Sequence, residues 1–293
     1  MHDPLIDKTI QYLNCLRDDN DISIKHIVLG SYFTVVELSD NNVGAVMSYY
    51  NANHLINGGL MHIINDVIAN DPQLLTSKDG FSHSIFNDWK NDHQFSLACA
   101  CILCALTSAL SQPYLSTNKT NEFIIHKEFP YHSKIFDSKS ALVIGFGGYL
   151  PFLIKETSIN NIYVCDLSYK TRYEEMNSML RDWLIDQPEK KITFFDSFED
   201  HADKEYDLLS ITGSSLCNGT LSQILNAHKN SFNIVQGQSA GIFPKFLFEA
   251  GVDMVSTTIK PRAIVKDAQK DLSGKFLTQY FEGGLPFIYL LPN

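Results

Sequence analysis

The sequence predicts an α/β protein in which a small α+β domain precedes a parallel, doubly wound sheet. In the first half of the chain, three short strand-like runs are followed by helical segments, which is the order of an α+β unit. In the second half, short apolar runs alternate with helical segments, which is typical of strands buried on both faces of a parallel sheet. At about 150 residues per domain, a chain of 293 residues makes two domains. We place them at residues 1–135 and 136–293.

The first half begins with an amphipathic helix. Its apolar residues recur every three or four positions from Leu5 to Leu16, which indicates one apolar face. Three strands are predicted next, at 24–29, 33–38 and 43–50. The turn before the last of them is rich in Asp and Asn, which tolerate hairpin geometry. Helices are then predicted at 60–69, 81–90 and 93–110, and Gln112 and Pro113 are assigned to a loop.

The second half repeats a strand-then-helix order. Its predicted strands are short apolar runs, at 141–144, 161–165, 192–195, 207–211 and 232–235. Helices are predicted at 170–185, 220–229 and 241–250, and another follows the glycine-rich sequence after the first strand. In open α/β sheets, ligands bind beyond the carboxyl ends of the strands. The residues that follow each strand are therefore the candidates for a site.

The composition of the chain indicates which partners and which cellular compartment to expect. The 23 Lys and Arg against 33 Asp and Glu give a net charge of −10, so neither nucleic acid nor a membrane surface is an expected partner. The N-terminus lacks the pattern of a signal peptide, and six cysteines are too few for a disulfide framework, so we expect a cytoplasmic protein. The most apolar segment, 95–110, is shorter than the ~20 residues of a membrane span and is interpreted as a buried helix. A homodimer is left open.

Glycines and an acid follow the first two strands of the second half. Gly145, Gly147 and Gly148 allow a backbone to approach a ligand closely, although a tight strand-to-helix turn explains them equally well. Asp166 lies 21 residues after Gly145, where nucleotide-binding units place an acid that binds ribose hydroxyls. Capping of the next helix is the alternative role for Asp166. The two features together favour a Rossmann-like nucleotide site.

Two further loops carry hydroxyl and amide groups. Residues 212–220 follow a strand and contain the candidate binding residues Ser214, Ser215, Asn218 and Thr220, although Asn218 also suits a helix cap. Residues 237–241 contain Gln238 and Ser239 in a G-x-S-x-G pattern. A serine hydrolase with that pattern needs a histidine after the acid, and the last histidine of the chain, at position 228, precedes Ser239. Ser239 is therefore expected to donate to a ligand or cap a helix.

These segments together resemble the putative heavy-metal chelation family. The resemblance is carried by residues 141–166, 212–221, 236–244 and 249–253, and more weakly by 27–38. It implies an enolase-N-terminal-like cap on a Rossmann-like domain, with a ligand in the cleft between them. It also implies a role in handling a metal or a metallocofactor.

The sequence itself offers little that would hold a metal ion. Cys99, Cys101 and Cys104 lie in a predicted helix, and at 100° per residue only two of the three can face one point. A structural zinc site needs four ligands, so small buried core residues are the preferred interpretation, and no metal ligand is assigned. A transition metal is considered as part of a ligand.

Two hypotheses about function follow. In the first, the protein binds a nucleotide-like or metal-chelate small molecule between its domains, through Gly145, Gly147, Gly148, Asp166, Ser214, Ser215, Asn218, Thr220, Gln238 and Ser239. In the second, it is an S-adenosylmethionine-dependent transferase that moves a methyl or aminocarboxypropyl group to a small metabolite. The expected cofactor is S-adenosylmethionine or another adenosyl compound, and the sequence names no general base.

Overall fold

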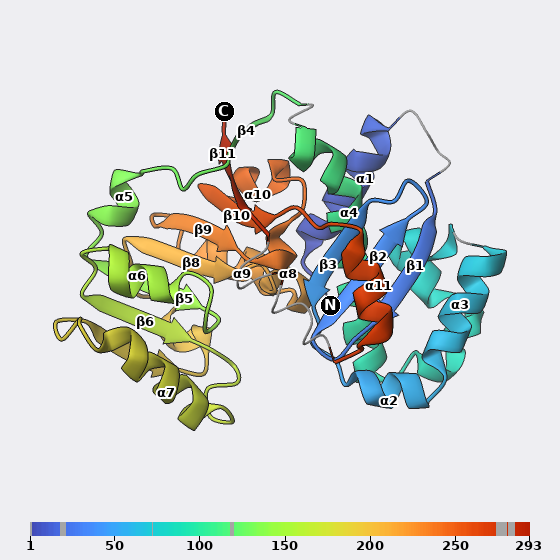
Figure 1. Ribbon diagram of the computed structural model, residues 1–293, viewed down its shortest axis with the longest axis horizontal. Helices are drawn as coiled ribbons and strands as arrows, with labels where there is room; N and C mark the ends of the chain where they lie inside the picture. The colour runs from blue at the N-terminus through green and yellow to red at the C-terminus, as the bar shows by residue number, and fades with distance from the viewer. Residues whose placement is uncertain (1, 18–21, 72, 118–119, 274–279, 281–284) are drawn as a thin grey trace.

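The computed structural model describes residues 2–17, 22–71, 73–117, 120–273, 280 and 285–293, and it contains two separate β-sheets (Figure 1). The smaller sheet has three antiparallel strands and comes from the first part of the chain. The larger has eight strands and is mostly parallel. In Figure 1 the arrowheads of the parallel strands point toward the side where the small sheet lies. The predicted α/β class, with a small α+β unit before a parallel sheet, is confirmed.

The small sheet and the helices on it form a unit that we call the cap. Its regular elements, in chain order, are α1 (Pro4–Leu16), β1 (Ile24–Leu29), β2 (Phe33–Leu38), β3 (Val43–Met47), α2 (Ala52–Asn57), α3 (Leu60–Asn70) and α4 (His93–Thr117). Asp3 caps α1 by accepting a hydrogen bond from the backbone N–H of Leu5. The helix predicted at 81–90 is instead a pair of 3₁₀ turns, η2 (Lys78–Ser82) and η3 (Ser84–Trp89).

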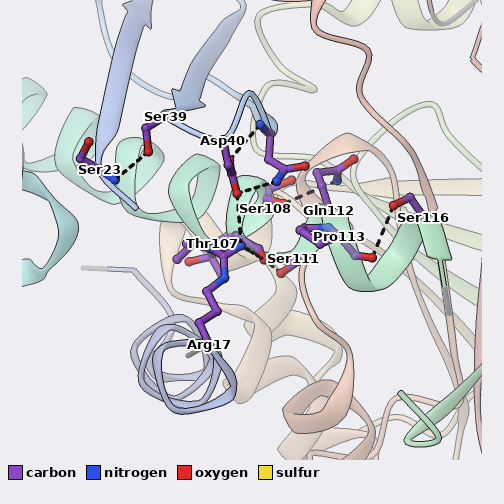
Figure 2. Close-up of polar contacts among 12 residues, drawn as sticks. Arg17, Ser23, Ser39, Asp40, Thr107, Ser108, Ser111, Gln112, Pro113 and Ser116 are labelled. Atoms are coloured by element: carbon purple, nitrogen blue, oxygen red, sulfur yellow. Dashed lines mark hydrogen bonds and ion pairs between the residues drawn. The ribbon is translucent and has the colours of Figure 1, made fainter. Parts of the chain in front are cut away.

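Helix α4 crosses the cap and is longer than the sequence predicted. It continues through Gln112 and Pro113 (Figure 2) to Thr117, so the assignment of these two residues to a loop was wrong. Gln112 is buried, and its side chain accepts a hydrogen bond from the backbone N–H of Lys260 in the other part of the fold, which holds this end of the helix in place. By length and composition α4 is long enough to span a membrane, but 78% of its apolar window is buried, as in the core helix of a globular protein.

The large sheet has the order β4-β11-β10-β9-β8-β5-β6-β7. Its strands are β4 (Phe123–His126), β5 (Ser140–Ile144), β6 (Asn161–Cys165), β7 (Lys191–Phe195), β8 (Leu208–Thr212), β9 (Phe232–Gln236), β10 (Met254–Thr258) and β11 (Phe287–Pro292). All pairs from β10 to β7 are parallel, and β11 and β4 add an antiparallel edge. The chain adds β6 and β7 on one side of β5 and then returns to add β8 on the other. This doubly wound order creates a switch point between β5 and β8.

Helices cover both faces of the large sheet. The helices of this part of the chain are α5 (Ser133–Phe136), α6 (Leu150–Glu156), α7 (Tyr173–Leu184), α8 (Ser215–Asn218), α9 (Leu221–Ala227), α10 (Lys245–Glu249) and α11 (Ala263–Lys270), of which α11 packs on the cap sheet instead. One face packs α6 and α7 through residues such as Val143, Leu150 and Leu180. The other face shares a continuous core with the cap, in which Leu142 and Leu209 pack in one cluster with residues of α1 and α4. This shared core fixes the cap beside the sheet.

Two elements connect the parts of the chain on either side of residue 135. Strand β4 precedes that position but pairs with β11 in the large sheet. Helix α11 follows it but packs on the cap sheet, where Ile264 and Val265 contact a cluster that includes Val28 and Val35. The division into 1–135 and 136–293 remains a prediction. The sequence also did not predict α11, β4, β10 or β11, whose short patterns are weak on their own.

Candidate functional site

The switch point between β5 and β8 brings the predicted loops together. Three close backbone approaches join them. A side chain added at Gly145 would lie 2.9 Å from Thr212, one at Gly148 would lie 2.2 Å from the amide of Gln236, and one at Gly213 would lie 2.3 Å from the backbone of Ala240. The loops that follow β5, β8 and β9 are therefore packed directly against one another.

The glycine loop after β5 needs glycine for its backbone conformation. Gly145, Gly147 and Gly148 have φ values of 92°, 112° and 54°, in a region that other residues rarely adopt. At Gly145 and Gly148 the missing side chain also makes room for the protein itself. At Gly147 nothing lies within 4 Å of the position that a side chain would take. Gly147 is thus the glycine of this loop that borders open space.

Asp166, after β6, ties the glycine loop to the neighbouring turn. One carboxylate oxygen accepts a hydrogen bond from the backbone N–H of Phe146 at 2.7 Å. The other accepts two, from the backbone N–H and the hydroxyl of Ser168 at 2.8 and 2.5 Å. A carboxylate offers about four acceptor positions, so about one remains. The structure thus places Asp166 beside the glycine loop and gives it a turn-capping role as well.

Two predicted serines face the cap. The hydroxyl of Ser239 accepts a hydrogen bond from the backbone N–H of Met47 at 3.1 Å, and the hydroxyl of Ser214 lies 3.8 Å from the Met47 sulfur. Met47 is the last residue of β3 and is 41% exposed, whereas both serines are buried. Tyr49 lies next to Ser214, and burial raises its pKa. The cap therefore meets the switch point at Met47 and Tyr49, two residues that no pattern in the sequence singled out.

The other predicted polar side chains form hydrogen bonds with neighbouring residues of the protein. The Ser215 hydroxyl donates to the carbonyl of Thr212 at 2.6 Å. The Asn218 side chain accepts from the N–H and the hydroxyl of Thr220 at 3.2 and 2.7 Å. The Gln238 side chain accepts from Thr258 at 2.5 Å. These four side chains belong to the loops that follow β8 and β9, but none of these hydrogen bonds links them to Asp166.

Comparison with known proteins identifies the relatives of this fold. A family model described as "putative heavy-metal chelation", DUF364, matches residues 132–281. The chain belongs to the DUF364 family. A search of curated proteins found no match.

Two solved DUF364 structures resemble the whole chain. The first, from Pyrococcus horikoshii, is a protein of unknown function with a TM-score of 0.59 and 15% identity, over 98% of both chains. The second, from Desulfitobacterium hafniense, also of unknown function, has a TM-score of 0.59 and 14% identity, over 98% of this chain and 96% of that one. At this identity the likeness establishes the fold. A spermidine synthase in complex with the transition-state analogue AdoDATO has a TM-score of 0.29 and supports no functional argument.

A buried lysine is hydrogen-bonded to the last loop of the candidate site. Lys260, which is 5% exposed, donates a hydrogen bond from Nζ to the carbonyl of Gln238 at 3.0 Å. A side chain added at Gly241 would lie 2.2 Å from the same Nζ. Burial alone lowers the pKa of Lys260 to about 7. This role could not be predicted from the sequence, because the lysine follows a strand that was not predicted.

Buried thiols lie where α4 of the cap contacts α8, the helix that follows β8. Cys101 and Cys104 on α4 both lie beside Cys217 on α8, and a hydrogen bond with Cys217 and burial raise the pKa of Cys101 well above its usual range. Cys99, the third cysteine of the run, is partly exposed. Among the described residues, no group of three or more His, Cys, Asp or Glu side chains is placed to hold a metal ion.

A separate, open hollow of about 720 Å³ lies at the far edge of the large sheet. It is bounded by α7 and β7, with Tyr169, Tyr173 and Phe194 among its lining residues, and it contains none of the predicted site residues. Because β7 is the edge strand, this hollow is two strands away from the switch point. Strand topology therefore favours the switch point over this hollow as the candidate site.

Proposed function

We propose that this DUF364 protein binds a small nucleotide-like or metal-chelate ligand where the cap meets the carboxyl ends of β5 and β8. The observation that carries the proposal is the meeting of Ser214 and Ser239 with the exposed Met47 at the switch point. Ligands of doubly wound sheets bind at this place in the topology. Asp166 and the open side of Gly147 extend the same rim.

A metal chelate fits the donor groups better than a bare ion does. The described residues contain no cluster of three metal-ligating side chains, so a metal ion would have to bring ligands of its own. Met47, a residue that is 41% exposed at the junction, carries a thioether, which is a soft, polarizable group. Ser214 and Ser239 add hydroxyl groups that suit the polar edge of a chelator. The description of the family agrees with this class of ligand.

An S-adenosylmethionine-dependent transferase is the second candidate. It is favoured by the place of Asp166, at the end of the strand next to the glycine loop. The sulfonium of that cofactor is already an activated donor, so the protein would mainly bind and orient it. Because Asp166 has about one free acceptor position, a ribose diol would need to displace Ser168.

Isothermal titration calorimetry tests both candidates on the full chain. The probes are S-adenosylmethionine, S-adenosylhomocysteine, and Ni(II), Co(II), Fe(II) and Zn(II), each alone and as its citrate complex. Met47→Ala removes the exposed side chain but keeps the backbone N–H that Ser239 binds. Met179→Ala, at a comparably exposed methionine on α7, is the matched control.

The results separate the candidates. Binding that is weakened by Met47→Ala and unchanged by Met179→Ala supports a ligand at the junction. Loss of adenosyl binding in Asp166→Asn, with chelate binding retained, distinguishes the transferase from the chelate binder. If no probe binds at millimolar concentration, or if Met47→Ala binds as the control does, the proposed site is rejected. A cytoplasmic location is proposed with it, since all six cysteines are free thiols.

A further inference from the structure

The large sheet ends at β7 with backbone groups that have no partner strand. Figure 1 shows α7, the helix that precedes β7, at the end of the molecule away from the cap sheet. The backbone N–H of Lys191 donates to the carbonyl of Asn160, on the side of β6. Alternate residues of a strand bond to opposite sides, so the N–H and C=O groups of Ile192 and Phe194 point outward. Within the described part of the chain, these outward groups form no hydrogen bond.

Nothing in the strand itself blocks this edge along its length. Proteins usually protect an exposed edge with a bulge, a proline or several charges. Strand β7 pairs with β6 in unbroken register and contains no proline, and of its five residues only the first, Lys191, is charged. Beside it lies the open hollow of about 720 Å³, which the partly exposed Ile192 and Phe194 help to line. The edge therefore offers an added strand both hydrogen-bonding groups and an apolar surface.

The face of α7 that lines the hollow is complementary in charge to itself. Its lining residues recur every three or four positions, at Tyr173, Glu174, Asn177, Leu180, Arg181 and Leu184. Glu174 and Arg181 are both exposed and lie about two turns apart on this face. Neither forms an ion pair with another described residue. A second α7 that runs antiparallel to the first would place Arg181 of each helix beside Glu174 of the other.

Strand β7 is complementary to itself as well. Antiparallel pairing about a two-fold axis at Thr193 sets Ile192 of each copy opposite Phe194 of the other, which are the residues whose backbone groups point outward. A β-branched residue opposite an aromatic one is a favourable cross-strand pair, and so is the pair of Thr193 residues on the axis. Each α7 packs over its own β6 and β7. Strands about 4.8 Å apart then bring the two α7 helices to about 10 Å, the distance of packed helices.

We propose that two copies of this chain associate through β7 and α7 as a symmetric dimer whose large sheets join into one. The second copy satisfies the outward backbone groups, covers Ile192 and Phe194, and pairs Glu174 with Arg181 twice. A strand from another protein would satisfy the backbone alone, whereas the two-fold symmetry supplies the match of charges as well. The interface shares no residue with the ligand site proposed at the switch point, and the two proposals are independent.

Sedimentation equilibrium of the full chain tests the interface by charge reversal. The wild type is expected to be a dimer at micromolar concentration. Glu174→Arg and Arg181→Glu, each alone, place like charges opposite each other and should weaken the dimer by about tenfold. The double variant, and an equimolar mixture of the two single variants, should dimerise as the wild type does, because opposite charges face each other again. Lys266→Glu, at an exposed lysine on α11, is the matched control and should leave the dimer unchanged.

Ile192→Pro tests the backbone pairing. It removes an outward N–H and keeps the bonds to β6, which an edge strand tolerates, so it should give a monomer. Circular dichroism confirms that each variant is folded, and if Ile192→Pro is not, the charge reversals at exposed side chains still decide. A monomeric wild type at high micromolar concentration overturns the proposal. So do single charge reversals that dimerise as the control does, a double variant and mixture that stay as weak as the single variants, or a folded Ile192→Pro that dimerises fully.

Discussion

Replacing Lys260 with methionine is expected to remove a specific pH dependence of stability. Burial lowers the pKa of Lys260 to about 7 in the folded protein, from an ordinary value of 10.5. Between these values the unfolded chain binds a proton that the folded chain does not, so the free energy of unfolding rises with pH. Below this window both states are protonated and above it neither is, so the contribution is flat. The slope reaches about 1.4 kcal/mol per pH unit within the window, and because Lys260 is about half protonated at pH 7, the rise between pH 7 and pH 9 is about 2.3 kcal/mol.

Urea unfolding of the wild type and Lys260→Met at pH 7, 8 and 9 measures this contribution. The difference in free energy of unfolding, wild type minus variant, should rise by the amount above across the series. A pH-independent offset of about 1 kcal/mol is expected from the lost hydrogen bond to Gln238. Lys266→Met, at an exposed lysine on α11, should give a flat difference because its ammonium is in water in both states. A flat difference for Lys260→Met would show that the amine is hydrated or paired, and would refute the reasoning.

Three further changes test the packing around the site by urea unfolding. Gly148→Ala combines backbone strain at φ 54° with a contact 2.2 Å from Gln236, so a loss of about 2–4 kcal/mol is expected. Adding Gln236→Ala should restore part of that loss, and strict additivity would contradict the contact. Asp3→Ala should cost about 2–4 kcal/mol, because this buried carboxylate caps α1 and accepts two hydrogen bonds from Ser222 in α9. Hydrogen bonds from the backbone lower the pKa of Asp207. The difference in free energy of unfolding between wild type and Asp207→Asn should therefore shrink as pH falls below 4, because the carboxylate is then protonated. A difference that stays constant with pH would contradict this role of Asp207.

The gathering of the loops could be predicted from the sequence because it depends on strand ends. Short apolar runs mark where β5, β6, β8 and β9 stop, and parallel strands present their carboxyl ends at one edge. Gly145, Asp166, Ser214 and Ser239 each follow such an end within a few residues. The prediction therefore needed no knowledge of side-chain contacts.

Side-chain direction within each loop could not be predicted in the same way. Ser214 faces the cap whereas its neighbour Ser215 bonds the backbone of Thr212, and the difference is set by α8, a helix of four residues. So short a helix has no periodic pattern that a sequence could reveal. Met47 and Lys260 were missed for a related reason, since their roles arise from contacts with residues more than 20 positions away.

The glycine loop shows why a glycine pattern alone does not identify a ligand. Each glycine has two possible causes, the approach of a ligand or the approach of the protein, and a sequence cannot separate them. Here Gly145 and Gly148 are explained by Thr212 and Gln236, so their conformations say nothing about a ligand. Gly147 has no such neighbour, and its left-handed backbone leaves open space beside it. Gly147→Ala adds a side chain to that open space and to no neighbouring protein group. If the folded variant binds the ligand more weakly than the wild type, the ligand lies at this loop. If the folded variant binds it with equal affinity, the ligand lies elsewhere on the rim.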